Sequence, residues 1–590
     1  MPEYMQKNAL ILLTACTCLL LLFAAYEMNA MNLVSDDQTD TGDGSGTDSS
    51  GDDQTDGSDY HEDPSDYVWD ESEVVEISLN GDSISAGSAF GVTIDGSIAT
   101  ITSAGTYRIS GSLADGQIIV DTGDEATVRL ILNGANISCS SSAPICIWNA
   151  ERAVIVLDDG SDNYVADGTS YALNAGSGEP NAAIFSKADL TIFGNGSLHV
   201  DANYNDGIAS KDGLIIMSGT IAVSSVDDGI RGKDYLVIKG GAIALDAAGD
   251  GLKSDNDEDA ERGYVSIGGC VLAITSGGDA IQAETDVVIV GGELAITSGG
   301  GSGQAVSDGA SAKGIKGNAS VTVSGGTFAI NSADDAIHSN GNVTVSGGTF
   351  TLSTGDDGIH ADLSLTISGG EINITKSYEG IESAIITVSG GSMRIASSDD
   401  GLNVAGGGDG SGMATRPGFG GDWSTAASGS YYLNIYGGYI YINANGDGVD
   451  SNGAITMTGG CLIVNGPTSS ANGALDFSSF QITGGFVLAV GSSGMAQAPA
   501  STADQKSVLL RFGSTVQAGT LFSIHASDGT VLFSFVPAKA IQSIAFSSPE
   551  LAPGTYTVYL GGSSTGTAVD GLYLNGTYTP GTVAGTFTVS

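Results

Sequence analysis

The stretch NVTVSGGTFTLSTGDDGIHAD, from Asn342 to Asp362, contains the unit that decides the fold of this chain. Close copies of the unit begin at Ser320, Ser364 and Ile386. Each copy has two short runs of alternating apolar and polar residues on either side of a Gly-Gly pair, and an acidic turn follows them. A repeat this regular indicates a chain built from stacked copies of one small structural unit.

An acidic residue marks the same position in successive units. Four of the eight steps between its occurrences are 22 residues, one is 21, and insertions lengthen the other three. The occurrences are Asp206, Asp228, Asp250, Asp279, Asp335, Asp357, Glu379, Asp400 and Asp447. A unit of this length cannot bury its own apolar side, so neighbouring units must stack. Three short strands per unit predict an all-β protein whose body is a right-handed parallel β-helix, from about Val75 to Gly491. The alternative, a β-propeller, needs about 40 residues per blade.

The two ends of the chain depart from the repeat. Residues 1–30 contain an apolar run of eighteen residues, Ala9 to Tyr26, which indicates a signal peptide or a retained membrane anchor. Residues 31–74 include fifteen carboxylates and no Lys or Arg, which is typical of an extended, disordered spacer. Residues 504–590 have longer alternating strands, which predict a small antiparallel β-domain or a cap on the β-helix. We therefore expect an extracellular or surface-attached protein that meets the membrane only through its N-terminal segment.

The composition limits the possible partners. The 590 residues include 19 Lys or Arg and 68 Asp or Glu, which gives a formal net charge of −49. Nucleic acid is excluded as a natural partner, because phosphate backbones are bound by clusters of Lys and Arg. An anionic membrane surface is disfavoured for the same reason. The six cysteines are too few for a disulfide framework, although Cys139 and Cys146 could either pair across one turn or remain two buried thiols.

Stacking of the units would place the acidic residues in a column, about 4.8 Å apart. Carboxylates this close repel unless backbone N–H groups, a basic side chain or a cation neutralises them. One interpretation is that each Asp caps its own Asp-Gly turn. The other is a Ca²⁺ site, because Ca²⁺ takes six to eight oxygen ligands and the acidic insertion Ser254 to Asp259 closely follows the column residue of its coil. A solvated acidic bulge is the alternative for the insertion. The predicted Ca²⁺ ligands are Asp227, Asp228, Asp250, Asp255, Asp257 and Asp279.

A second row of residues lies three positions after the acidic column and is basic in its middle. Its members are Arg231, Lys253, Gln282, Lys316, His338, His360, Glu382, Asn403 and Asp450. These cations could neutralise the acidic column, the interpretation favoured for Arg231, or pair with the carboxylates of uronate sugars. We name Arg231, Lys253 and Lys316 as candidate carbohydrate-binding residues. We expect no catalytic residue, but in a Ca²⁺-dependent lyase Lys253 would be the general base.

A row of tyrosines is the second candidate binding surface. In the segment YYLNIYGGYIYIN the leucine and isoleucines match inward positions, so the tyrosines are expected to point outward. Exposed aromatic rings can stack on sugar faces. The candidate sugar-stacking residues are Tyr436, Tyr439 and Tyr441. The alternative is that the insertion of residues 404–430 folds over them.

The run DGLKSDNDEDAERGYVSIGGCVLAITSGGDAIQAETDVVIVGGELAITSGGGS, from Asp250 to Ser302, resembles a bacterial family of extracellular carbohydrate-binding β-helix proteins. The likeness continues through AKGIKG, DDAIHSN and DDGIHAD and into SSPELAPGTYTVYLGGSS near the C-terminus. The resemblance implies a right-handed parallel β-helix, bound calcium and binding to plant-cell-wall-type polysaccharide without demonstrated catalysis. The family's fold is similar to that of pectate lyases.

Together these observations predict a monomeric, non-catalytic protein that binds cellulose or acidic, pectic polysaccharide with the support of Ca²⁺. Two alternatives belong to other functional classes. One is a Ca²⁺-dependent polysaccharide lyase of the pectate type. The other is a purely structural surface adhesin.

Overall fold

The computed structural model describes residues 60–88, 90–173, 178–307, 309–405, 431–573 and 576–590. The chain divides into two compact units, Met1–Tyr67 and Val68–Ser590. In the first unit the described part contains one short 3-10 helix, η1 (Pro64–Tyr67). The predicted signal or anchor segment and most of the predicted spacer lie outside the described residues. In the described part of the chain, no helix is long and apolar enough to cross a membrane.

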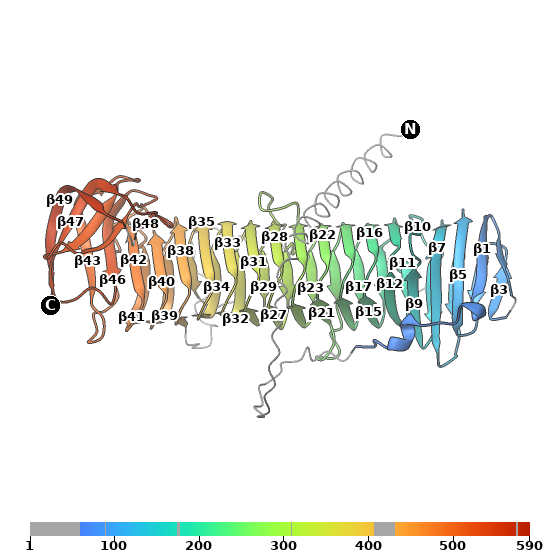
Figure 1. The fold of residues 1–590 in the computed structure, drawn as a ribbon. Coiled ribbons are helices and arrows are strands. Elements are labelled where there is room, and N and C mark those ends of the chain that lie inside the picture. The colour runs from blue at the N-terminus through green and yellow to red at the C-terminus, as the bar shows by residue number, and fades with distance from the viewer. Residues whose placement is uncertain (1–59, 89, 174–177, 308, 406–430, 574–575) are drawn as a thin grey trace, which may run out of the picture. The chain divides into compact units, whose positions relative to one another are not determined.

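The second unit begins with a 3-10 helix, η2 (Glu71–Glu73), and then consists of strands that follow one another in stacked coils (Figure 1). A full coil has three strands, and each strand pairs in parallel with its equivalent in the coils before and after it. One coil, for example, contains β16 (Thr220–Ser225), β17 (Ile230–Gly232) and β18 (Tyr235–Ile238). These strands pair with β19 (Ala242–Ala247), β20 (Leu252–Ser254) and β21 (Tyr264–Ile267). The body is therefore a parallel β-helix, and the predicted all-β solenoid is confirmed.

The strands form three parallel stacks, of which the first carries the acidic column and the second row. The strands of this first stack are β4 (Ile98–Ile101), β6 (Gln117–Asp121), β8 (Ile145–Asn149), β11 (Ala182–Ser186), β14 (Asp206–Ser210), β17, β20, β23 (Ile281–Ala283), β26 (Ile315–Gly317), β29 (Ile337–Ser339), β32 (Ile359–Ile367), β34 (Ile381–Val388), β36 (Leu402–Val404), β39 (Val449–Met457) and β41 (Leu475–Ile482). The second stack runs from β5 (Gly105–Leu113) through β7 (Thr127–Cys139) and β9 (Arg152–Leu157) to β41. The third runs from other residues of β5 and β7 through β10 (Asp162–Asp167) to β42 (Phe486–Gly491). Because β32, β34, β39 and β41 are long, each contributes to both the first and the second stack.

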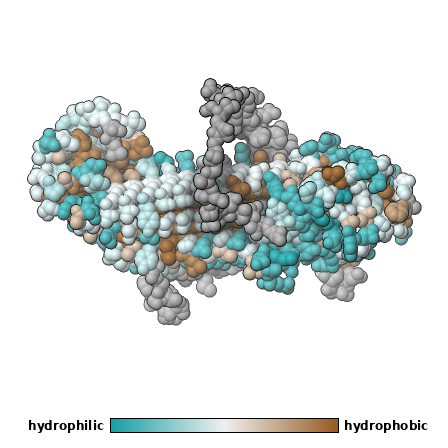
Figure 2. All heavy atoms as spheres, turned by 60° about the horizontal axis from the view of Figure 1, so that its bottom comes forward, coloured by the Kyte–Doolittle hydropathy of each residue, from teal (hydrophilic) through white to brown (hydrophobic). Residues whose placement is uncertain are grey.

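Alternation along these short strands separates the core from the surface. In the first stack Ile230, Leu252, Ile281 and Ile315 are fully buried and belong to one continuous hydrophobic core. The residue after each of them faces away from this core, because successive side chains of a strand point to opposite faces. The face of the molecule in Figure 2 accordingly carries hydrophobic residues in small, separate patches.

The Gly-Gly pairs mark the turns between coil strands, as the repeat predicted. At Gly348 the backbone φ is +100°, a conformation that residues with a side chain rarely adopt. A Cβ on the preceding Gly347 would lie 2.3 Å from the carbonyl oxygen of Ser324 in the neighbouring coil. Both glycines are therefore required, one for the turn and the other for the close approach of adjacent coils.

The N-terminal end of the β-helix is closed by antiparallel pairs rather than by a full coil. Strand β1 (Val75–Gly81) pairs antiparallel with β2 (Ile84–Ala86), and β3 (Val92–Asp95) pairs antiparallel with β4 (Ile98–Ile101). β1 also pairs in parallel with β5 (Gly105–Leu113), which starts the regular stacking. Covering the end in this way protects strand edges that could otherwise pair with another chain.

The C-terminal strands continue the β-helix and add a second sheet. Strand β46 (Ile541–Ser547) pairs antiparallel with the last coil strand, β42, and with β43 (Ser507–Val516). The separate five-stranded antiparallel sheet has the order β48 (Leu572–Tyr573), β45 (Val531–Phe535), β44 (Phe522–Ala526), β47 (Gly554–Ser564) and β49 (Tyr578–Val589). A second hydrophobic core joins this sheet to Ile463 and Leu488 of the last coils. We refer to residues 504–590, which contain this sheet together with β43 and β46, as the cap.

Candidate functional site

The acidic column is held by a repeated hydrogen bond between neighbouring coils. One carboxylate oxygen of Asp228 accepts the backbone N–H of Asp250 at 2.9 Å, and Asp250 accepts that of Asp279 at 2.9 Å. The same bond joins Asp335 to the N–H of Asp357 at 2.9 Å. The prediction that each Asp caps its own Asp-Gly turn is therefore wrong, because each of these carboxylates accepts the backbone N–H of the equivalent residue in the next coil. Each bond satisfies a buried donor and fixes the spacing of the coils.

The second row exists as predicted, since strand pairing places its members in one register. Arg231 pairs with Lys253, Lys253 with Gln282, and Gln282 with Lys316. The row continues through His338, His360, Glu382, Asn403, Asp450 and Asp476. The column and the row therefore run side by side along the first stack.

The three predicted carbohydrate-binding cations of this row are engaged with the acids. Lys253 Nζ lies 2.8 Å from Asp250 and 3.1 Å from Asp228, so it bridges two coils. Burial alone would lower the pKa of Lys253, but these two carboxylates outweigh burial and raise it. Lys253 therefore holds its proton and is a poor general base. Lys316 Nζ lies 3.4 Å from the column residue Asp279.

Arg231 pairs with the acidic insertion. Its Nε and Nη2 lie 3.0 and 2.5 Å from the two carboxylate oxygens of Asp255, a two-point contact of the kind a guanidinium favours. Its Nη1 lies 3.7 Å from Asp206. Asp257 is exposed, and Asn256 turns inward to donate to Asp234 at 2.6 Å. In this insertion Asp255 is therefore held in an ion pair with Arg231, and its carboxylate is not free to bind a metal ion.

The six predicted Ca²⁺ ligands do not come together as one set. Asp227 and Asp228 lie with Asp206 in a group whose carboxylate oxygens are within 4.8 Å of one another. Asp250 forms an ion pair with Lys253, and Asp255 forms one with Arg231. Asp279 accepts the Ser311 hydroxyl at 2.6 Å and the Lys313 backbone N–H at 2.7 Å.

Lys313 interrupts the column and was missed by the sequence analysis. It stands where an acid would be expected between Asp279 and Asp335, because the Asp279 carboxylate caps its N–H. Its buried ammonium lies 2.9 Å from Asp335 and 3.0 Å from Asp334. The signal was available, since Lys313-Gly-Ile-Lys316 repeats the pattern Asp250-Gly-Leu-Lys253 with the acid replaced.

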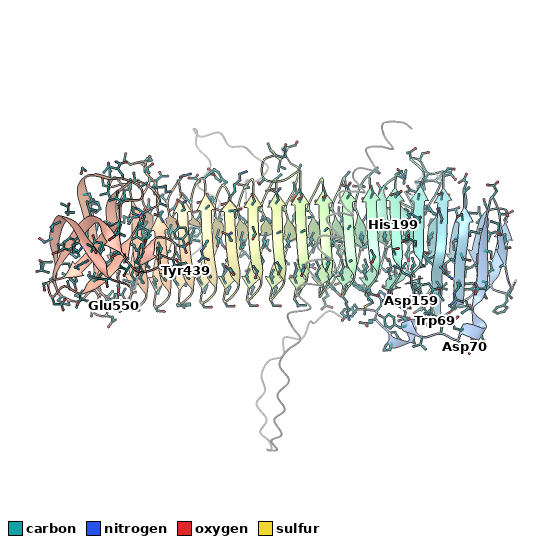
Figure 3. The ribbon with its side chains drawn as sticks, turned by 45° about the horizontal axis from the view of Figure 1, so that its top comes forward. Trp69, Asp70, Asp159, His199, Tyr439 and Glu550 are labelled. Carbon is teal, nitrogen blue, oxygen red and sulfur yellow. The ribbon has the colours of Figure 1, made fainter. Side chains whose placement is uncertain are left out.

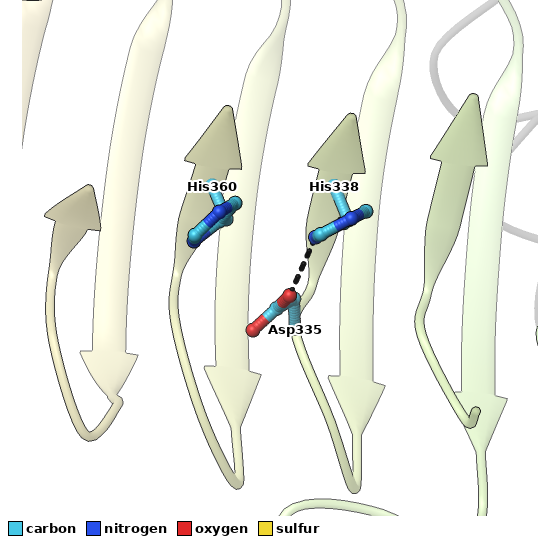
Figure 4. Close-up of side chains that lie close together, drawn as sticks. All are labelled: Asp335, His338 and His360. Atoms are coloured by element: carbon cyan, nitrogen blue, oxygen red, sulfur yellow. Dashed lines mark hydrogen bonds and ion pairs between the residues drawn. The ribbon is translucent and has the colours of Figure 1, made fainter. Parts of the chain in front are cut away.

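The two histidines of the row are stacked between carboxylates. Their ring centroids are 5.0 Å apart, and His338 Nδ1 lies 2.9 Å from Asp335 (Figure 4). His360 has Asp357 at 3.1 Å and Glu382 at 3.3 Å on Nδ1, and Asp362 at 3.0 Å on Nε2. Burial alone would lower the pKa of His360, but these carboxylates raise it, so the imidazole stays protonated. A protonated imidazole has no lone pair for a metal, so His360 serves the column as a cation.

The last coils keep the acidic column but have no cations in the row. Asp400 and Asp447 lie with Asp450 in a second group of carboxylates within 4.8 Å of one another. Burial, with the neighbouring carboxylates, raises the pKa of Asp400 to about 7 and that of Asp447 to about 6. Among the described residues, no Lys, Arg or His forms an ion pair with these three side chains. This group escaped the sequence analysis, which placed the Ca²⁺ ligands earlier in the chain.

The predicted row of open tyrosines is divided by the C-terminal cap. Tyr436 is 51% exposed. Tyr439 and Tyr441, in β38 (Tyr439–Ala444), are partly buried and pack against the second hydrophobic core. The Tyr439 hydroxyl donates to Asp570 of the cap at 2.7 Å, and Figure 3 shows Tyr439 near the last coils. The prediction of an open surface is therefore wrong for Tyr439 and Tyr441, which the cap covers. The insertion proposed as the alternative cover lies largely outside the described residues.

The cysteines in the described part of the chain are thiols. Cys139 and Cys146 are both buried and not bonded to each other, which is the second of the two predicted possibilities. Burial raises the pKa of Cys146 to about 12, so this thiol is not reactive.

Residues 95–358 match the family described as "Carbohydrate-binding domain-containing protein". A protein of that description from Acetivibrio thermocellus is 40% identical over 151 residues, which are 25% of this chain and 53% of the relative. The chain thus spans about half the length of the curated relative that it matches. The match covers most of the cation-bearing coils and ends just before the coils in which the row becomes acidic. Over this segment, the resemblance inferred from the sequence is confirmed.

Among solved structures, the chain is similar to the "polysaccharide lyase-like protein from C. thermocellum", determined as a gadolinium derivative. The identity is 32%, the match covers 46% of this chain and 96% of that chain, and the TM-score is 0.38.

Proposed function

We propose that this protein binds polysaccharide, cellulosic or acidic, without cleaving it, at the cell surface or outside the cell. The observation that carries the proposal is the match of residues 95–358 to carbohydrate-binding proteins, over coils whose side chains are fixed in a regular ladder. A rigid parallel β-helix offers a long surface on which equivalent positions repeat from coil to coil, as the repeat of an extended polymer does. The apolar N-terminal segment supports export or attachment, and a monomer is the expected state.

The state of Lys253 favours binding over catalysis. A lyase of the pectate type needs a base that can remove a proton next to a sugar carboxylate. Lys253, the residue predicted for that role, is held between Asp228 and Asp250, and its pKa is raised. An ammonium so placed cannot accept a proton near neutral pH.

Ca²⁺ is proposed as a support of the fold. Hard oxygen ligands suit this ion. Besides Asp334, Asp335 and Asp356, two of which already pair with the Lys313 ammonium, two groups of described residues offer three carboxylates each. In the first group, Asp206, Asp227 and Asp228, lysine and arginine already supply part of the countercharge. In the second, Asp400, Asp447 and Asp450, a bound divalent cation would supply the positive charge that lysine and arginine supply in the first group. This group is therefore the better fit for Ca²⁺. Bound there, Ca²⁺ would neutralise carboxylates of two adjacent coils.

The test is a sedimentation assay of the full-length chain with insoluble cellulose and with covalently cross-linked pectin beads, which stay insoluble with or without Ca²⁺. Each polymer is tested in EDTA and in CaCl₂ at about 1 mM, within the range in which extracellular Ca²⁺ modules bind the ion. We expect the protein to leave the supernatant with at least one polymer. The same mixtures, followed by ultraviolet absorbance with polygalacturonate, should show no unsaturated product. Accumulation of unsaturated product would replace the proposal with a lyase, and absence of sedimentation with both polymers would leave a structural adhesin as the better description.

A further inference from the structure

Lys313 is a buried amine that is enclosed by carboxyl groups, at the point where the acidic column is interrupted. It lies just before β26, and 4% of it is exposed. Asp334 and Asp335 lie just before β29, the equivalent strand of the next coil, and are 3% and 0% exposed. Water therefore has little access to this cluster of three side chains, and the function proposed above does not use it.

The amine is in contact with both carboxyl groups. Lys313 Nζ lies 3.0 Å from Oδ1 of Asp334 and 2.9 Å from Oδ2 of Asp335. The carboxyl carbon of Asp334, Cγ, is one covalent bond beyond Oδ1, so the amine and an electrophilic carbon are already held together. Such fixed proximity can accelerate a reaction between two groups by many orders of magnitude. The cluster thus places a nucleophile beside an acyl carbon in a site that excludes water.

The two carboxyl oxygens of Asp334 are in different states. Oδ1 accepts the backbone N–H of Asp335 at 3.0 Å, in addition to the ammonium of Lys313. Oδ2 is buried and has no hydrogen-bond partner among the described residues. A buried oxygen without a partner is unfavourable, and its departure would remove that cost. A backbone N–H on the other oxygen is the kind of donor that stabilises the negative charge of a tetrahedral intermediate.

The two carboxyl groups also differ in their affinity for a proton. Burial, followed by the charge of Asp335, raises the pKa of Asp334, which favours its uncharged form. Burial alone would raise the pKa of Asp335 as well, but Lys313 and His338 outweigh burial and lower it. His338 Nδ1 lies 2.9 Å from Asp335 (Figure 4). An uncharged acid can be attacked by an amine, and a neighbouring carboxylate can accept the proton of that amine.

We propose that Lys313 and Asp334 condense to an amide that links the two neighbouring coils, with Asp335 transferring the protons. Asp335 takes one proton from the ammonium, and the amine attacks Cγ of Asp334. A C–N bond forms, and Oδ1 takes up the electron pair of the carbonyl double bond. Asp335 then gives its proton to the Oδ2 hydroxyl and takes a second proton from the nitrogen. The Cγ–Oδ2 bond breaks, one water molecule leaves, and Asp335 ends with one proton.

Comparison with Lys253 shows which condition sets Lys313 apart. Lys253 also lies between two carboxylates, but its side chain is 24% exposed, compared with 5% for that of Lys313. An ammonium that water reaches keeps its proton, and water opposes a condensation that releases water. Lys253 should therefore remain an ion-paired lysine.

The position of the link in the chain indicates what it would contribute. Lys313 and Asp334 lie within the longest step of the acidic column, between Asp279 and Asp335. A covalent link restricts the unfolded chain and thereby stabilises the folded one. The amide would secure the coils where the repeat is least regular, and it does not depend on the binding of polysaccharide.

The experiment is mass spectrometry of the full-length wild-type protein, denatured and digested with trypsin, which cuts after Lys and Arg. Without the amide, Lys313 ends one peptide, and Asp334 lies in a separate peptide, residues 317–376. With the amide, trypsin does not cut after Lys313. We expect residues 263–316 joined to residues 317–376, lighter than the two peptides together by the mass of one water. Fragmentation should place the bond between Lys313 and Asp334.

Variants assign the roles within the cluster. Lys313→Arg and Asp334→Ala should each give unlinked peptides only. Asp335→Asn should slow linkage about a hundredfold, measured as the linked fraction at successive times after synthesis. Two further variants are controls that should leave the link in place. Lys253→Met removes an ion-paired lysine of another coil, and Asp356→Asn changes a third carboxyl group of the same cluster.

Three outcomes would overturn the assignment. Unlinked peptides alone from the wild type would do so without any variant, so the folding of the variants does not decide the test. A bond from Lys313 to Asp335 or Asp356 would show that Asp334 is not the acceptor. Linkage at the wild-type rate in Asp335→Asn would exclude Asp335 as the group that transfers the protons.

Discussion

The coils that carry Arg231 to His360 and the coils that carry Asn403 to Asp476 share one acidic column but differ in the row beside it. In the first region each column carboxylate lies near a cation, as Asp250 does near Lys253 at 2.8 Å. In the second region the row contains Asn403, Asp450 and Asp476, and carboxylates face carboxylates.

The hydrogen bond between coils is the same in both regions. Asp228 caps the backbone N–H of Asp250 at 2.9 Å, and Asp400 caps that of Asp447 at 2.6 Å. The column therefore does not need a row cation in order to stack. What differs is how its charge is neutralised: by fixed side chains in the first region, and by retained protons or an external cation in the second.

Calcium is expected to have the largest effect, and to act mainly on the second region. Ca²⁺ at one hundred times its Kd would raise the free energy of unfolding by about 2.7 kcal/mol if it binds the folded state alone. Asp447→Asn should remove most of this gain, because it takes one charge from the group and keeps the side chain's shape. Thermal unfolding in Ca²⁺ and in EDTA provides the measurement. An equal gain in the variant would place the ion elsewhere.

Removing the central cation of the first region should destabilise the protein. Lys253→Met leaves Asp228 and Asp250 without their shared cation. We expect the free energy of unfolding to fall by about 2 kcal/mol, which is less than the cost of breaking a fully buried ion pair because Lys253 is partly exposed. Urea unfolding followed by circular dichroism measures it. Lys506→Met, on the cap, is the matched control. A loss no larger than that of the control would mean that the first region is not neutralised by its lysine.

Glu379, at the border between the two regions, should make stability depend on pH. Burial, followed by Glu382, raises its pKa to about 9 from a usual value of 4.5. Between these values the folded state binds more protons than the unfolded state, so the free energy of unfolding falls as pH rises. Glu379→Gln should remove this fall and stabilise the protein at pH 8, by about 1 kcal/mol after allowance for solvent screening.

The measurement is urea unfolding of the wild type and the variant at several values between about pH 5 and pH 9. The control is Glu293→Gln, in strand β25 (Glu293–Ser298) of the third stack. Among the described residues, Glu293 belongs to no group of neighbouring carboxylates. Parallel pH profiles for wild type and Glu379→Gln would contradict the prediction.

The smallest effect is expected from making the second region resemble the first. Asn403 occupies the position of Lys253, so the ammonium in Asn403→Lys would lie between Asp400 and Glu379. We expect a gain of about 1 kcal/mol at pH 8, because Asp400 is then largely ionised and the new ammonium would also favour the ionised form of Glu379, whose pKa is raised to about 9. The gain should shrink when Asn403→Lys is combined with Glu379→Gln, because one of its two partners is then neutral. Additive effects would show that the new lysine does not reach Glu379.

Much of the fold could be predicted because the repeat is explicit. The Gly-Gly pairs, the alternation and the spacing of the acids together specify stacked coils, and with them the register that aligns Arg231 with Lys253. The cap was less predictable, because its strands repeat nothing and their partners lie far along the chain. Pairing of β46 with β42 joins Ser547 to Val487, and such a contact leaves no periodic trace.

The candidate site was predicted as two rows but not as a set of contacts. The sequence placed Asp255 and Asp257 with calcium, whereas Asp255 pairs with Arg231 one coil earlier. The contact of Lys539 with the Ala444 carbonyl left no signal at all, since the two residues are 95 positions apart and lie in the cap and in the coils.

The sequence by itself determined the coil, its turns and the two parallel rows, because a short repeat can bury its apolar residues only by stacking in register. It also determined that the row changes from basic to acidic along the stack. Tertiary structure alone decided which acids are neutralised by a side chain and which tyrosines are covered. These outcomes depend on side-chain distances of a few ångströms and on the docking of the cap, and no local pattern encodes either of them.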